Sequence, residues 1–135
     1  ALDRMAEPLD LAWLRTFHQG SAAAPLPPGF LETMAAESAK VPLRVWRQAL
    51  AGMTAEDHSA RLGTLRALTL LIWGEEDPLL PPAEREAMAR RIPGARLLVL
   101  PHLGHAVHWE DPRRFARELV AFVEATPPAG SPRGR

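Results

Sequence analysis

The sequence contains no cysteine, and this absence excludes several kinds of chemistry at once. A chain without cysteine has no disulfides and no thiolate nucleophile, and it cannot bind zinc or an iron–sulfur cluster through sulfur. Net charge is also missing, because 16 basic side chains balance 16 acidic ones. A neutral chain lacks the broad positive surface that binds nucleic acid or anionic membranes. We therefore expect no nucleic-acid partner and no membrane partner.

Long apolar runs are absent as well. No segment approaches the ~18 residues of a membrane span, and the first residues lack the basic-then-apolar order of a signal peptide. We therefore expect a cytoplasmic protein. The 135 residues suit one domain, and 47% hydrophobic and 24% charged residues are typical of a globular chain. The first residue is Ala1 and not methionine, which leaves open a processed, nicked or cloned fragment.

The N-terminal half has a helical pattern throughout. Residues 1–64 are predicted to form helices separated by proline and glycine, without any strand. Asp10 is placed to cap the first helix. Residues 21–29 are rich in alanine and proline and are predicted to form a linker. Further helices are predicted over about 30–40 and from Pro42 onward, so this half forms a small helical layer.

The pattern changes at Leu65. Two continuous apolar runs are typical of parallel strands buried on both faces, and each is followed by a helical pattern. The predicted order is strand 68–73, helix 83–92, strand 96–100, loop 101–111 and a last helix with Phe115, Leu119, Phe122 and Val123 on one face. This order predicts a parallel α/β unit over residues 65–126. Residues 127–135 have the composition of a disordered tail.

Two side chains capable of acid–base chemistry follow the predicted strands. Asp77 lies four residues past the first strand and His105 five residues past the second. Adjacent parallel strands would bring these two loops side by side, at the edge where functional residues gather. A carboxylate beside an imidazole fixes its tautomer and stabilises its charged form, so that histidine can act as a general base. A purely structural alternative stays open, in which Asp77 caps a turn and His105 is a surface residue.

Four short motifs follow one another in this part of the chain. They are LLIWGEEDP at 70–78, IPGAR at 92–96, LPHLGH at 100–105 and EDP at 110–112. Together they resemble the C-terminal part of the α/β-hydrolase-fold family over residues 65–125. The resemblance implies that Asp77 is the acid and His105 the base of a catalytic triad, with no cofactor. Residues 1–64 resemble, less specifically, the lid (cap) that these enzymes insert over the active site.

The family's nucleophile is absent from this chain. In the family it is a serine, sometimes Asp or Cys, on a Gly-x-Ser-x-Gly turn that precedes the acid and the base. No serine of this chain lies in such a motif or follows a predicted strand; the four are Ser21, Ser38, Ser59 and Ser131. The loop that supplies oxyanion-hole amides is also missing, and each such donor is worth about 2.7–4 kcal/mol. We therefore expect no acyl-transfer catalysis by this chain alone.

The resemblance implies a lid-bearing parent hydrolase for a small apolar ester, lactone or carbon–carbon bond substrate. The absent serine would attack the carbonyl, His105 would take its proton and pass it to the leaving group, and Asp77 would orient His105. With an Asp nucleophile, the same pair would serve a dehalogenase or an epoxide hydrolase. Two other classes stay open: a non-catalytic remnant that binds or oligomerises, and one half of a split or cleaved enzyme.

Two further groups of residues have functional and structural interpretations. His102, His105 and His108 recur every third residue, but the loop that carries them has no helix to align three ligands, so we expect no metal. Three tryptophans are candidates for lining an apolar substrate pocket, although most such residues serve packing. They are Trp13, Trp46 and Trp109.

The predicted sheet is too small to be complete. Two strands and two helices cannot cover both faces and both edges, and open parallel edges pair readily with another chain. We therefore expect that a missing N-terminal half, or a second copy in a homodimer, completes the sheet, and that the substrate is a small molecule.

Overall fold

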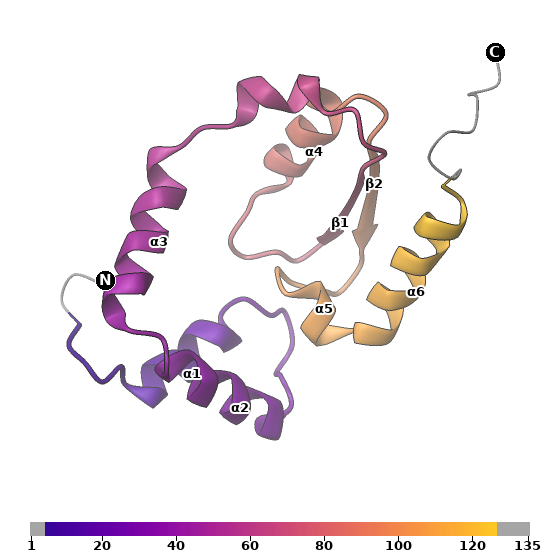
Figure 1. Cartoon of the computed structure of the whole chain (residues 1–135). Coiled ribbons are helices and arrows are strands. Elements are labelled where there is room, and N and C mark those ends of the chain that lie inside the picture. Colours follow the sequence, from indigo (N-terminus) through magenta and orange to yellow (C-terminus); the bar gives the residue numbers. More distant parts are fainter. Residues whose placement is uncertain (1–4, 127–135) are drawn as a thin grey trace, which may run out of the picture.

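The computed structural model describes residues 5–126 and shows a helical segment followed by a small α/β core (Figure 1). The elements are α1 (Leu11–Gln19), α2 (Pro28–Ala39), α3 (Leu43–Ala55), the 3-10 helix η2 (Ser59–Thr64), β1 (Leu70–Gly74), α4 (Pro82–Arg91), β2 (Arg96–Leu100), α5 (Val107–Glu110) and α6 (Pro112–Glu124). The tail predicted over 127–135 lies outside the described residues. Within the described part of the chain, no helix combines the length and apolar character of a membrane span.

The helical segment has a core of its own. Asp10 caps α1 as predicted, because its side chain accepts a hydrogen bond from the Ala12 amide at 2.9 Å. A fully buried Leu14 projects from α1 and packs with the buried Ala35 of α2 and Leu43 of α3. The three predicted helices are present, and residues 5–64 contain no strand.

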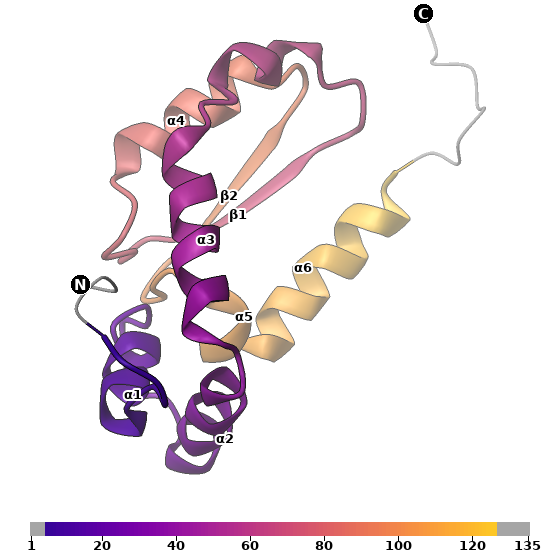
Figure 2. The same cartoon turned by 60° about the vertical axis from the view of Figure 1, so that its left-hand side comes forward.

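The core is a parallel β-α-β unit. β1 and β2 pair in parallel register from Leu70 opposite Arg96 to Gly74 opposite Leu100. α4 connects the two strands and contacts both of them (Figure 2). The chain therefore belongs to the α/β class, with helices before the strands and the β-α-β-α order expected for the C-terminal part of a larger sheet.

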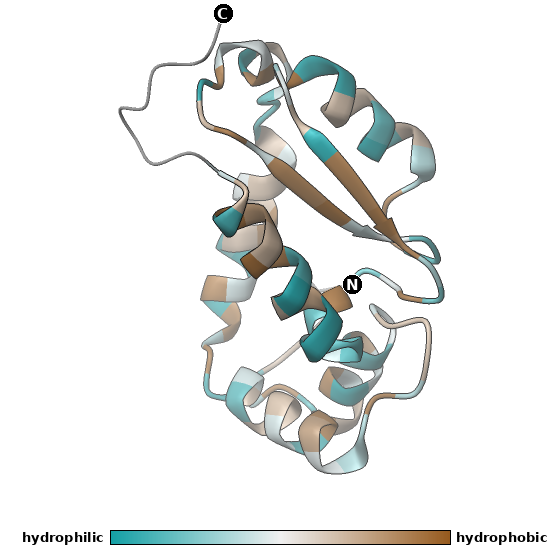
Figure 3. Ribbon diagram, turned by 90° about the vertical axis from the view of Figure 1, so that its right-hand side faces the viewer, coloured by the Kyte–Doolittle hydropathy of each residue, from teal (hydrophilic) through white to brown (hydrophobic). Residues whose placement is uncertain are grey.

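The expectation that both strands are buried on two faces is wrong for the chain by itself. Trp73 and Leu100, at the strand ends, are buried, whereas most other strand side chains are only partly buried. The physical reason is that the sheet has two strands, so each of them is an edge strand. Figure 3 shows both strands as predominantly hydrophobic along their length.

The connection between β2 and the last helix spans residues 101–111 as predicted, but it is not a loop throughout. The loop expected over 101–111 contains the helix α5, which packs beside β1. Asp111 then begins α6 by accepting a hydrogen bond from the Arg114 amide at 2.9 Å. The apolar face of α6 is only partly covered, because Leu119 is 42% exposed and Val123 is 61% exposed.

Candidate active site

The two loops that follow the strands run side by side. The Glu75 amide donates a hydrogen bond to the Leu100 carbonyl, and the Glu76 amide donates to the Leu103 carbonyl, both at 2.9 Å. These bonds continue the contact between β1 and β2 beyond the ends of the strands. They place the segment that carries Asp77 against the segment that carries His105.

Glycine is required where these loops touch. A Cβ atom added at Gly74 would lie 1.9 Å from the carbonyl oxygen of Gly104 and 2.3 Å from that of Leu103. A Cβ atom at Gly104 would lie 2.6 Å from the amide nitrogen of Ala23, which belongs to the helical segment. Such distances are far below van der Waals contact, so a side chain at either position would separate the segments.

Asp77 and His105 form a hydrogen bond, as the adjacency of their loops led us to expect. The His105 Nδ1 atom lies 2.9 Å from Oδ2 of Asp77. The Asp77 side chain is 4% exposed, whereas the His105 side chain is 42% exposed. The other carboxylate oxygen of Asp77 accepts hydrogen bonds from the amides of Leu79 and Leu80. The carboxylate is therefore fixed from both sides, and the ring that it holds faces outward.

Burial and hydrogen bonding act in opposite directions on the Asp77 carboxyl group. Burial raises its pKa, and the hydrogen bonds from His105, Leu79 and Leu80 lower it. The hydrogen bonds together outweigh burial, so the pKa of Asp77 lies below its ordinary value of 3.8. Asp77 is therefore ionised at neutral pH and can hold His105 as the Nδ1–H tautomer.

A small cavity adjoins the pair. It has a volume of about 160 Å³, and its lining includes Ile72, Trp73 and Leu80 besides Asp77 and His105. Pockets that enclose a small-molecule ligand usually measure about 300–1,000 Å³. The residues of this chain therefore form one apolar wall beside the pair, with less volume than a complete substrate pocket has.

The three histidines of the HxxHxxH spacing have different partners. His105 contacts Asp77, whereas the His102 ring lies 3.4 Å from a carboxylate oxygen of Glu76. The His108 ring packs against Trp109 and Phe115. Among residues 5–126, no three His, Cys, Asp or Glu side chains form a group that could hold a metal ion.

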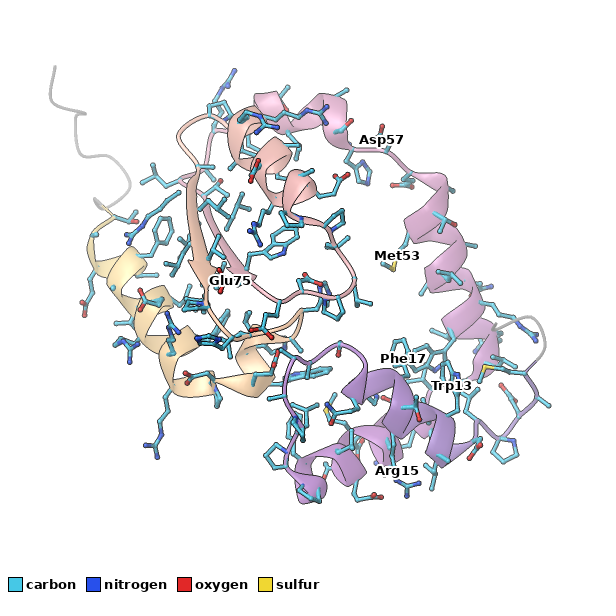
Figure 4. All side chains as sticks on the ribbon, turned by 180° about the vertical axis from the view of Figure 1, so that it is seen from behind. Trp13, Arg15, Phe17, Met53, Asp57 and Glu75 are labelled. Carbon is cyan, nitrogen blue, oxygen red and sulfur yellow. The ribbon has the colours of Figure 1, made fainter. Side chains whose placement is uncertain are left out.

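The three candidate tryptophans belong to one continuous set of ring contacts. The rings of Trp13 and Trp46 lie edge to face with their centroids 6.1 Å apart, and both residues pack against the core of the helical segment. Figure 4 shows Trp13 and Phe17 on α1 and Met53 projecting from α3. Trp109 joins this set through His18, whose ring centroid lies 5.7 Å from that of Trp109 and 5.3 Å from that of Phe17. A shared role of the three rings in one substrate pocket stays a prediction.

One histidine–serine contact was not predicted from the sequence. The Nε2 atom of the buried His18 lies 2.8 Å from the Ser38 hydroxyl. The other ring nitrogen of His18 is buried without a hydrogen-bond partner, and burial lowers the His18 pKa. A base needs an orienting acceptor and a basic ring, so this contact is better suited to holding α1 on α2 than to catalysis. The helical spacing of apolar residues predicts neither member of the pair.

The serine closest to the His105 backbone is also engaged elsewhere. The Ser21 carbonyl accepts the His105 amide at 2.8 Å, but the Ser21 hydroxyl donates to the His18 carbonyl at 2.7 Å. Segment 21–24, predicted to be a linker, therefore packs directly on the loop that carries His105. Its composition contains no signal for this long-range contact.

Comparisons with known proteins found a matching family model and similar proteins. A model of the alpha/beta hydrolase family matches residues 1–118. The curated 2-hydroxy-6-oxo-6-phenylhexa-2,4-dienoate hydrolase of Burkholderia cepacia is 32% identical over 96 residues, which are 71% of this chain and 30% of that protein. The chain thus spans about a third of the length of this relative.

Two solved esterase structures are also similar. The esterase from Exiguobacterium antarcticum superposes with a TM-score of 0.79 at 23% identity, over 85% of this chain and 43% of that one. The thermophilic esterase from Thermogutta terrifontis has a TM-score of 0.65 at 29% identity, over 81% of this chain and 38% of that one. The family model covers more than half of the chain, and the chain therefore belongs to the alpha/beta hydrolase family.

Proposed function

We propose that Asp77 and His105 are the acid and the base of a hydrolase active site whose nucleophile is not among these 135 residues. The observation that carries the proposal is the hydrogen bond between a buried carboxylate and an exposed imidazole. Both groups stand at the carboxyl ends of adjacent parallel strands, where α/β sheets place their active sites.

The geometry supports a proton-transfer role for His105. With Nδ1–H donating to Asp77, the Nε2 lone pair is available, and within residues 5–126 this atom forms no hydrogen bond. A serine hydroxyl that approaches Nε2 would lose its proton as it attacks a carbonyl carbon. The same proton would then pass to the leaving group, and a water molecule would repeat the sequence to release the acyl group.

The substrate that fits is small and largely apolar. Ile72, Trp73 and Leu80 form the described wall beside the pair. The names of the relatives cover a 6-oxo-dienoate and esters, which supports a substrate with a carbonyl group next to the scissile bond. Residues 1–64 would act as a lid over this site, because the helical segment contacts the loop of His105.

Reconstitution tests the proposal. The 135-residue chain is mixed with a separately produced N-terminal half of an alpha/beta hydrolase that carries the nucleophile, and hydrolysis of a short-chain p-nitrophenyl ester is followed. We expect turnover only in the mixture, reduced at least about 10³-fold by His105→Ala. His102→Ala is the matched control, because His102 lies in the same loop with a side chain that is 88% exposed. Equal turnover with and without His105 would refute the proposal.

A further inference from the structure

The Glu110 carboxylate joins two parts of the chain that are far apart in sequence. One oxygen accepts a hydrogen bond from the Gly104 amide at 2.8 Å. The other oxygen accepts from the amides of Ala23 at 2.8 Å and Ala24 at 3.3 Å. Glu110 therefore connects the loop before His105 to a segment more than 80 residues earlier in the chain.

The backbone amides at and next to His105 all donate hydrogen bonds in this contact. The Gly104 amide donates to Glu110, and the next two amides, of His105 and Ala106, both donate to the Ser21 carbonyl at 2.8 and 3.1 Å. Three consecutive amides are thus fixed by two acceptors. The missing side chain of Gly104 lets segment 21–23 approach closely enough for these bonds to form.

We propose that Glu110 is a positioning residue, which holds the His105 ring on Asp77 by tying segment 21–24 to the loop of His105. This inference rests on the proposed function of His105 as a base. Glu110 contacts neither the His105 ring nor Asp77 in the described hydrogen bonds, so it acts through the backbone.

The contact also couples the helical segment to the base. Segment 21–24 connects α1 to α2, and its amides and carbonyl bind Glu110 and the His105 loop. A displacement of α1 and α2 therefore pulls on the backbone of His105. If residues 1–64 act as a lid, its position and the orientation of the base are linked through Glu110.

The variant Glu110→Gln tests the role with little change in shape. Glutamine has one acceptor oxygen where Glu110 uses two, so its NH₂ group must face either the Gly104 amide or the amides of Ala23 and Ala24. One side of the connection is then lost. Glu124→Gln is the matched control, since it removes the same charge from an exposed position on the following helix.

The readouts come from NMR on the ¹⁵N-labelled chain and need neither substrate nor nucleophile. Two-bond ring spectra at about pH 8 report which nitrogen of His105 carries the proton. We expect the Nδ1–H tautomer in the parent chain and in Glu124→Gln, and a shift toward Nε2–H in Glu110→Gln. Amide exchange of Ala23, Ala24 or Gly104 should accelerate about tenfold or more, since a hydrogen bond to a charged group is lost.

The outcomes separate this inference from the proposed function. The positioning role is refuted if Glu110→Gln and Glu124→Gln have the same His105 tautomer and the same amide exchange rates. This holds whatever activity the reconstituted mixture has. If Glu110→Gln fails to fold, Gly104→Ala attacks the same contact from its other side, where the new Cβ meets the Ala23 amide. A parent-like His105 tautomer in folded Gly104→Ala would equally overturn the inference.

Discussion

At the scale of single residues, the site depends on a contrast in exposure between two bonded side chains. Asp77 is buried and fixed by three donors, whereas His105 is exposed beside a cavity. The hydrogen bonds keep the pKa of Asp77 below 3.8, so the stability that the ionised group contributes is present above that value. It is lost as the pH falls through the lower pKa of the folded chain.

His18 should make the free energy of unfolding depend on pH as well, in a higher pH range than Asp77 does. Burial lowers the pKa of His18 below its ordinary value of 6.5. The unfolded chain therefore binds a proton more readily than the folded chain, and the free energy of unfolding should decrease as the pH falls below about 6.5. Urea unfolding at about pH 7.5 and about pH 5.5 measures this decrease. His18→Gln should reduce it, and an undiminished decrease in that variant would contradict the assignment.

Gly74→Ala should separate the two loops that carry Asp77 and His105. The added Cβ would lie 1.9 Å from the Gly104 carbonyl oxygen, so the loops must move apart. We expect loss of the Nδ1–H tautomer of His105 in ring ¹⁵N spectra. Gly52→Ala is the control, because a Cβ at Gly52 in α3 meets nothing within 4 Å and should not destabilise the helix. An unchanged His105 tautomer in Gly74→Ala would show that the close contact is not required.

At the scale of elements, the two apolar faces of the core differ in how well they are covered. Leu100 at the end of β2 is fully buried, whereas Val123 on α6 is 61% exposed. Leu100→Ala should therefore lower the free energy of unfolding by about 2–5 kcal/mol. Val123→Ala should change it by about 0.5 kcal/mol or less. Urea unfolding of both variants checks the contrast, and a large cost at Val123 would mean that α6 is covered in solution.

Local sequence signals predicted most elements but not the contacts between them. Asp10 bears a cap signal that the structure reproduces, and the apolar runs predicted both strands. Strand burial could not be predicted from the apolar runs, because it depends on how many strands the sheet has, and this sheet has two. The short α5 was missed, since four residues carry too little periodicity to be distinguished from a loop.

The candidate site could be predicted only where it follows the strands. Asp77 and His105 stand at strand ends, so parallel pairing is enough to bring them together. Glu110 accepts hydrogen bonds from backbone amides, which every residue type except proline offers. A contact of that kind has no residue-type signature, and the connection between segment 21–24 and the His105 loop became visible only in the structure.

At the scale of the whole molecule, the chain exposes surfaces that a complete α/β sheet would cover. Both strands are edge strands. Several large apolar side chains of the α/β part of the chain are exposed to solvent, among them Leu68, Leu79, Leu119 and Val123. We therefore expect the purified chain to form a homodimer or to aggregate unless a partner polypeptide is present. Light scattering measures this directly. A monodisperse monomer would contradict the expectation that the sheet needs completion.

The central claim is that this chain supplies the acid and the base of a hydrolase site but not its nucleophile. The most direct measurement is the rate of ester hydrolysis by the purified 135-residue chain, compared with that of His105→Ala. We predict that both rates equal the buffer background, because His105 has no activated hydroxyl to deprotonate. Robust turnover by the parent chain that His105→Ala abolishes would contradict the claim, since it would show that a nucleophile lies within these 135 residues.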